Sequence, residues 1–121
     1  MKRVFTCFVL TLFFISCGNS QEIKSITTAE LKEVLSNDKI QLLDVRTAAE
    51  IKDGAIETAI FVDFYSDNFT SEVLAQLNKN KPVYIYCRSG NRSMKASNIL
   101  QEKGCKVINV LGGYNAWKQE N

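Results

Sequence analysis

The sequence of 121 residues contains no histidine, and this absence excludes a large group of catalytic sites. Without an imidazole, the chain has no histidine base to activate a serine or cysteine and no histidine ligand for a metal. Any nucleophile must therefore be activated by nearby charges or by hydrogen bonds. We expect neither a metal nor another cofactor.

The chain also has no apolar run as long as a membrane span, which needs roughly 20 residues. Lys2 and Arg3 precede an uncharged segment over residues 4–15, and the sequence becomes polar soon after Cys17. A basic start followed by about a dozen apolar residues is typical of a secretory signal. The start of the chain is therefore interpreted as a targeting segment and not as part of the fold.

The residues Phe14-Ile15-Ser16-Cys17 resemble the end of a lipoprotein signal. The resemblance implies that Cys17 becomes the first mature residue and carries lipid, and several acyl chains together anchor a protein stably. We expect a signal peptide over residues 1–16, a lipidated tether over 17–24 and a folded domain over 25–121. The domain would then be anchored to a bacterial cell membrane and face the periplasm. The alternative is an ordinary signal peptide and a soluble secreted protein.

An excess of positive charge is missing as well. Removing Lys2 and Arg3 with the signal reduces the 15 basic residues to 13, which equals the 13 acidic residues. Nucleic-acid binding requires a basic patch or stripe, and we find none. We expect no nucleic-acid partner, and we expect the domain to be a monomer.

Helical and extended patterns alternate along the rest of the chain. Thr27 and Thr47 each stand three residues before a glutamate, Glu30 or Glu50, in capping boxes that predict helix starts. Strands are predicted at 40–45, 59–62, 82–86 and 106–110, with a further short one at 23–26, and helices at 28–37, 48–53, 70–77, 93–103 and after 113. Such alternation predicts an α/β fold, an open, mainly parallel sheet of four to five strands with helices on both faces.

Cys87 stands between the strand at 82–86 and the helix at 93–103, where ligands bind in open parallel sheets. The helix start offers free N–H groups and partial positive charge. Gly90 and Asn91 tolerate positive φ, so the loop amides can turn toward an anion. Arg88 and Arg92 add positive charge, and no carboxylate is close in sequence. All these features favour the thiolate, which is the nucleophilic form of cysteine.

Three segments resemble, in order, the signatures of single-domain rhodanese-like sulfurtransferases, and they span most of residues 26–117. They are Leu43-Asp44-Val45-Arg46 with Glu50 and Gly54-Ala55-Ile56, then Cys87-Arg88-Ser89-Gly90-Asn91-Arg92-Ser93, and last Leu111-Gly112-Gly113-Tyr114-Asn115-Ala116-Trp117. The resemblance implies a thiosulfate sulfurtransferase, in which Cys87 takes sulfane sulfur from a small anionic donor. The resulting persulfide passes its outer sulfur to a thiol or to cyanide.

The resemblance also implies roles for single residues. The loop of Arg88, Ser89, Gly90, Asn91 and Arg92 would bind the substrate, with the Arg92 side chain on the anionic donor. Asp44 and Arg46 share one face of a strand by the two-residue period, and we interpret them as a structural polar pair near the site.

Three alternatives remain. Cysteine phosphatases and arsenate reductases of similar architecture place five residues between the cysteine and the arginine, whereas four separate Cys87 from Arg92. A non-catalytic rhodanese-like binding module at the membrane surface is the second. The third is a redox pair of Cys87 and Cys105. The helix at 93–103 would separate them by about 16 Å, whereas a disulfide needs Cα atoms within about 7 Å. We therefore predict no bond between them.

Overall fold

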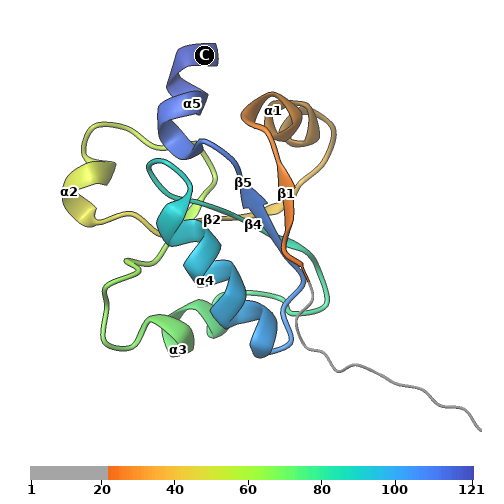
Figure 1. The fold of residues 1–121 in the computed structure, drawn as a ribbon, viewed down its shortest axis with the longest axis vertical. Coiled ribbons are helices and arrows are strands. Elements are labelled where there is room, and N and C mark those ends of the chain that lie inside the picture. The colour runs from red at the N-terminus through yellow and green to blue at the C-terminus, as the bar shows by residue number, and fades with distance from the viewer. Residues whose placement is uncertain (1–21) are drawn as a thin grey trace, which may run out of the picture.

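The computed structural model describes residues 22–121, which form one sheet with helices on both faces (Figure 1). Its strands are β1 (Lys24–Ile26), β2 (Gln41–Asp44), β3 (Ile60–Phe61), β4 (Val83–Tyr86) and β5 (Val107–Val110). They lie in the order β1-β5-β4-β2-β3, and every neighbouring pair is parallel. The predicted α/β class is confirmed. The predicted signal peptide and Cys17 lie outside the described residues, whereas Lys24, placed in the tether, belongs to β1.

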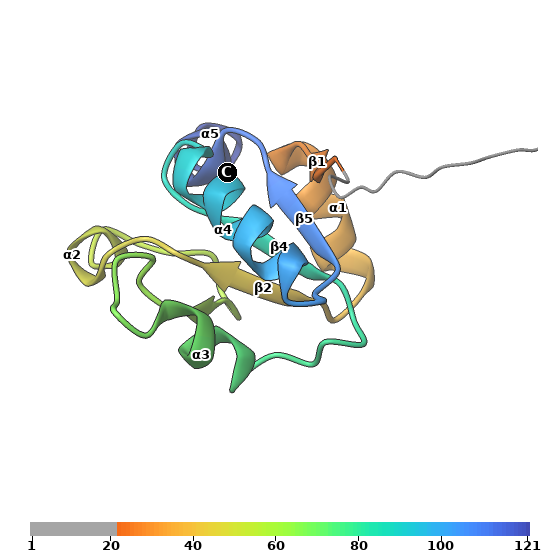
Figure 2. The same ribbon diagram turned by 60° about the horizontal axis from the view of Figure 1, so that its bottom comes forward.

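The helices are α1 (Thr28–Asn37), α2 (Ala48–Ile51), α3 (Phe69–Leu74), α4 (Asn91–Glu102) and α5 (Gly113–Glu120). Helices α3 and α4 pack on one face of the sheet, and α1 and α5 pack on the other (Figure 2). Within residues 22–121, no helix is both long enough and apolar enough to cross a bilayer.

Alternate residues of the central strands enter two separate cores. The core under α3 and α4 contains Leu43, Val45, Val83, Ile85, Val73, Ala96 and Leu100. The core under α1 and α5 contains Leu42, Tyr86, Val110, Leu31 and Ile56. Burial on both faces is usual for a parallel sheet and accounts for the continuous apolar runs in its strands.

Both predicted capping boxes are present. The Glu30 carboxylate accepts from the Thr27 N–H at 2.8 Å, and the Glu30 N–H donates to the Thr27 hydroxyl at 3.1 Å. The same exchange joins Thr47 and Glu50 at 3.0 and 3.3 Å. Each box satisfies N–H groups that a helix start leaves without partners, so α1 and α2 begin where these threonines predict.

Several predicted boundaries were wrong. Helix α4 begins at Asn91, two residues before the predicted start, and α2 ends at Ile51 instead of residue 53. Helix α3 ends at Leu74, where the Gln76 N–H bonds to the carbonyl of Val73, three residues back, at 2.9 Å and so leaves the helical pattern. Strand β3 has two residues instead of four, since it forms the edge of the sheet and pairs with β2 alone.

Candidate active site

Cys87 directly follows β4 at the carboxyl end of the strand, and three residues separate it from the start of α4 at Asn91. Gly90 has φ of +113°, a left-handed conformation that lets the chain turn from the strand into the helix. Asn91 was expected to share this conformational freedom, but it is the first residue of α4. The turn is therefore shorter than predicted, and Asn91 and Arg92 project from the first helical turn.

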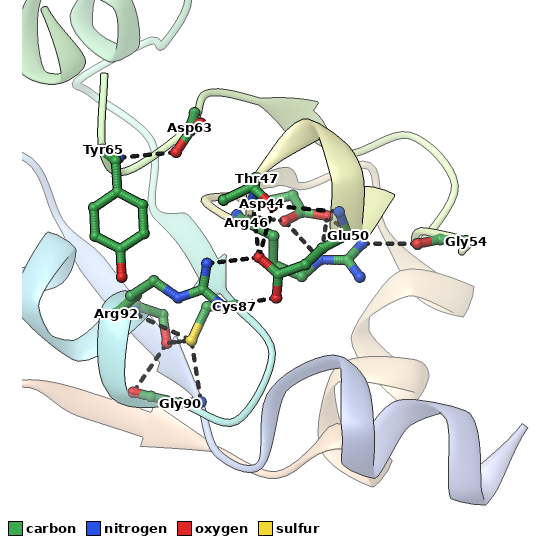
Figure 3. Close-up of polar contacts among 11 residues, drawn as sticks. Asp44, Arg46, Thr47, Glu50, Gly54, Asp63, Tyr65, Cys87, Gly90 and Arg92 are labelled. Atoms are coloured by element: carbon green, nitrogen blue, oxygen red, sulfur yellow. Dashed lines mark hydrogen bonds and ion pairs between the residues drawn. The ribbon is translucent and has the colours of Figure 1, made fainter. Parts of the chain in front are cut away.

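Three polar groups surround the Cys87 sulfur (Figure 3). The N–H groups of Gly90 and Ser93 donate to Sγ at 3.1 and 3.3 Å, and the Ser93 hydroxyl oxygen lies 3.4 Å from Sγ. The thiol donates to this hydroxyl, which in turn donates to the carbonyl of Gly90 at 3.1 Å. When the thiol loses its proton, the hydroxyl can rotate and donate to the sulfur.

The balance of burial and hydrogen bonding lowers the pKa of Cys87. Burial alone raises the pKa, because Cys87 is only 1% exposed and a thiolate loses its hydration there. The Ser93 side chain and then the N–H groups of Ser93, Gly90 and Ser89 act in the opposite direction, and the net pKa lies below the ordinary value. The geometry therefore favours a nucleophilic thiolate without a histidine.

Ser93 was missed as a site residue, although it stands in the motif. The sequence analysis placed it at the helix start and gave it no contact. Because α4 begins two residues earlier, Ser93 sits inside the first turn, with its N–H and its hydroxyl both near the sulfur. A serine in the first turn of a helix that follows a cysteine loop is the signal that could have found it.

The first turn of α5 packs against the backbone of the turn after Cys87 and holds it by hydrogen bonds. The N–H groups of Tyr114 and Asn115 donate to the carbonyls of Cys87 and Arg88 at 2.8 and 3.0 Å. Gly113 has φ of +55°, and a Cβ there would collide with the carbonyl oxygens of Cys87 and Arg88. The close approach of the two segments therefore requires glycine at this position, which gives the Leu111–Trp117 segment a physical role in the site.

Arg92 is held by a carboxylate from another part of the chain. Its two terminal nitrogens donate to the two Glu50 oxygens at 2.7 and 2.8 Å. The Arg92 hydrogen bonds lower the pKa of Glu50 to about 2, against the effect of burial and with help from Thr47. No carboxylate is close to Cys87 in sequence, but Glu50 offsets the charge of Arg92 in space. Glu50 follows β2, the neighbour of β4, so strand order and not sequence distance brings it to the site.

The other residues of the predicted substrate loop face solvent. Arg88, Ser89 and Asn91 are exposed, whereas Gly90 and Arg92 are half-buried. Of the predicted binding residues, Gly90 and Ser89 act on the sulfur through their N–H groups, and Arg92 approaches the site with its side chain.

Asp44 and Arg46 form a buried ion pair beneath the segment that carries Glu50. Arg46 Nη2 lies 2.7 Å from the Asp44 carboxylate and 2.8 Å from the carbonyl of Gly54, to which it donates. The guanidinium also lies over the Tyr114 ring, with 4.3 Å from its carbon to the ring centroid. These contacts tie β2 to the segment at 46–54 and to α5, and so position Glu50 indirectly.

Cys105 lies where the parallel strands begin, whereas Cys87 lies where they end. It precedes β5 by two residues, Val83 pairs with Val107, and Cys87 follows the far end of β4. Both thiols are free. Residues 22–121 also contain no group of three or more acidic or cysteine side chains arranged to hold a metal ion.

A cavity of about 770 Å³ lies elsewhere, on the face covered by α1 and α5. Leu35, Ile40, Ile56 and Trp117 line its apolar part. The Cys87 side chain enters the core on the other face, so we place the chemistry at the sulfur and not in this cavity.

The fold and the site together define an α/β domain that presents a cysteine of lowered pKa in an amide-lined turn. The chain belongs to the rhodanese family, because the Rhodanese-like domain model matches residues 27–120. It is 40% identical over 100 residues to YtwF of Bacillus subtilis, covering 82% of this chain and 94% of that protein. It is 33% identical over 97 residues to a sulfurtransferase of Allochromatium vinosum, covering 78% and 88%.

A solved structure agrees with the sequence relatives. The crystal structure of a rhodanese-like domain protein from Staphylococcus aureus superposes with a TM-score of 0.72 at 41% identity, covering 78% of this chain and 91% of that one. At the level of the family, these relatives support sulfur transfer as the activity of the domain.

Proposed function

We propose that this protein is a sulfurtransferase that carries sulfane sulfur as a persulfide on Cys87. The observation that carries the proposal is the set of polar groups around one buried sulfur: two N–H groups donate to Sγ, and the Ser93 hydroxyl, which can donate once the thiol loses its proton, lies 3.4 Å away. These groups stabilise negative charge on Sγ. The donor is a small anionic compound of the thiosulfate type, and the acceptor is a thiol or cyanide.

The first half of the reaction is a displacement at sulfur. The Cys87 thiolate attacks the outer sulfur of thiosulfate, an Sγ–S bond forms and the sulfur–sulfur bond of the donor breaks. Sulfite leaves with the bonding electron pair, and the negative charge of the thiolate moves to the outer sulfur of the persulfide. The same N–H groups that stabilise the thiolate then lie beside the new anion, and this preorganised arrangement lowers the barrier.

The second half returns the enzyme to its starting state. Cyanide, or the thiolate of an acceptor, attacks the outer persulfur and takes it as thiocyanate or as a new persulfide. The Cys87 thiolate leaves with the electron pair of the broken bond. No proton, metal or redox partner is required in either half, which suits a site without histidine.

Mass spectrometry of the purified protein tests the proposal. After incubation with thiosulfate, the mass should increase by one sulfur atom, and cyanide should restore the original mass. The Cys87→Ser variant should gain nothing. A wild-type protein whose thiol is titratable but gains no sulfur from thiosulfate or polysulfide would instead favour the non-catalytic binding module.

We also propose that the domain acts as a monomer outside the cytoplasm, anchored through lipid on Cys17. The resemblance at residues 14–17 supports the anchor. Feeding cells an alkyne-tagged fatty acid should label the protein, and Cys17→Ala should remove the label. Label that survives this substitution would contradict the anchor.

A further inference from the structure

The Arg92 side chain, which lies beside Cys87 in Figure 3, is already bound to a carboxylate. Both of its terminal nitrogens bind Glu50, in the parallel two-bond arrangement that is the strong form of an arginine–carboxylate pair. The two side chains are only 17% and 26% exposed. An anionic donor that approaches Arg92 therefore meets a cation whose charge is largely offset.

Glu50 is fixed by contacts that do not depend on Arg92. Its Oε1 accepts from the N–H and from the hydroxyl of Thr47, both at 3.0 Å, and its own N–H donates to the Thr47 hydroxyl. The pKa of Glu50, lowered to about 2, keeps the carboxylate charged throughout the physiological range. A donor cannot displace this carboxylate without breaking the cap of α2.

The Cys87 thiolate, the Arg92 guanidinium and the Glu50 carboxylate together carry one negative charge. Arg88 lies in the same loop but is exposed, so solvent and salt screen its charge. The exposed Tyr65 ring lies 5.8 Å from the Arg92 guanidinium carbon and brings no charge that would offset Glu50. Repulsion from a fixed carboxylate grows in proportion to the charge of the approaching group. A donor with two negative charges is therefore penalised more than a donor of the same shape with one.

We propose that Glu50 determines the charge of the sulfur donor, so that the site prefers sulfane-sulfur compounds with one negative charge over dianions such as thiosulfate. This inference rests on the proposed persulfide function and narrows its substrate class. Glu50 acts through Arg92 and contacts neither Sγ nor the transferred sulfur, so it is a specificity residue and not a catalytic one.

Two donors of closely similar shape separate the effect of charge from that of size. Methanethiosulfonate is thiosulfate with one charged oxygen replaced by a methyl group. Attack by the Cys87 thiolate on its outer sulfur breaks the sulfur–sulfur bond and releases methanesulfinate with the electron pair. The persulfide product is the same as that from thiosulfate, which releases sulfite.

The test measures kcat/KM for both donors, with cyanide as acceptor, in the wild type and in Glu50→Gln. Glutamine also fits the third position of a capping box, so the variant removes the charge and keeps the helix start. The ratio of kcat/KM for thiosulfate to that for methanethiosulfonate should rise at least about fivefold, the size expected for one partly exposed charge. Glu50→Ala, which removes the charge without adding an amide, should raise the ratio in the same direction.

Glu30→Gln is the matched control, because Glu30 forms the other capping box and carries the same charge. It should leave the donor ratio at the wild-type value. A ratio that stays constant in both Glu50 variants, while persulfide still forms on Cys87, would overturn the role of Glu50 and leave the proposed function intact. Absence of persulfide from either donor in the wild type would overturn both.

Discussion

The two cysteines of the folded domain are buried to nearly the same extent, 1% exposed for Cys87 and 5% for Cys105, yet their pKa values shift in opposite directions. Burial raises the pKa of both thiols. At Cys105 only the charge of Lys79 opposes burial, and the net pKa is raised. At Cys87 the Ser93 side chain and three N–H groups lower the net pKa. The polar groups around each sulfur, and not its depth, therefore set the direction in which its pKa shifts.

The largest difference should appear when each thiol is removed. We expect Cys87→Ser to lower the transfer of sulfur to cyanide on the order of 1,000-fold or more, since the nucleophile is lost. Cys105→Ala should keep the rate within about twofold, because it changes only the far edge of the sheet. Thiocyanate formation measures both. A loss of transfer in Cys105→Ala, with an intact fold by circular dichroism, would contradict the comparison.

Two glycines provide a second contrast: Gly113 contacts the backbone of Cys87, and Gly104 precedes Cys105 in the sequence. Gly113→Ala would push a Cβ into the carbonyls behind Cys87, so we expect a loss of about 2 kcal/mol of unfolding free energy. Transfer should fall more than about tenfold, because the turn around the sulfur shifts. Urea denaturation and thiocyanate formation are the measurements.

Gly104→Ala is the control for this second contrast. Gly104 precedes Cys105 and also has a left-handed φ, +94°, but a Cβ there meets only the end of the Lys79 side chain, 3.5 Å away. We expect backbone strain of about 1 kcal/mol and no change in transfer. Equal losses of activity in the two alanine variants would mean that Gly113 has no special role at Cys87.

Two serines of α4 test the source of the lowered pKa. Ser93→Ala removes the side-chain hydrogen bond to Sγ, so the pKa of Cys87 should rise. Because alkylation requires the thiolate, its rate with iodoacetamide at neutral pH should fall by about threefold to tenfold, and its pH profile should move to higher pH.

Ser97→Ala is the control for Ser93→Ala. Ser97 is equally buried one turn later, but its hydroxyl donates to the carbonyl of Ser93 at 2.7 Å. The alkylation profile of Cys87 should stay in place when Ser97 is changed. If both variants shift the profile equally, the effect comes from the stability of α4 and not from the contact between Ser93 and the sulfur.

The smallest effect concerns stability alone. Cys105→Ala deletes one buried sulfur from the core under α3 and α4, and we expect a loss of about 1 kcal/mol. Cys87→Ala should cost more than this, because it also leaves the N–H groups of Gly90 and Ser93 without their acceptor. Thermal or urea unfolding compares the two. The reverse order would show that the donors at Cys87 find other partners.

Most of the fold follows from local sequence signals. The two capping boxes predict where α1 and α2 begin, and the apolar runs predict the three longest strands, β2, β4 and β5, because these signals act within a few residues. The end of α3 was less predictable, since there the Gln76 N–H bonds to the carbonyl of Val73, three residues back, and not to the carbonyl four residues back. The length of β3 depends on its place at the edge of the sheet, which no local pattern gives.

The residues of the site also fall into two groups, those that local sequence signals predict and those that only the strand order brings to Cys87. Cys87 and its turn are visible in the sequence, because a strand, a cysteine, a glycine and a helix follow one another. Glu50 and Gly113 are 37 and 26 positions away from Cys87, and they reach the site only through the order of the strands. The sequence shows the capping role of Glu50, but its pairing with Arg92 requires the neighbouring positions of β2 and β4.

The most direct test of the account locates the transferred sulfur on one of the two cysteines. The protein is loaded with thiosulfate or methanethiosulfonate, trapped with an alkylating reagent, digested and mapped by mass spectrometry. We predict one additional sulfur atom on the peptide that contains Cys87 and none on the peptide that contains Cys105. Extra sulfur on Cys105, or on both cysteines equally, would contradict the claim that the donors around Cys87 make it the sulfur carrier.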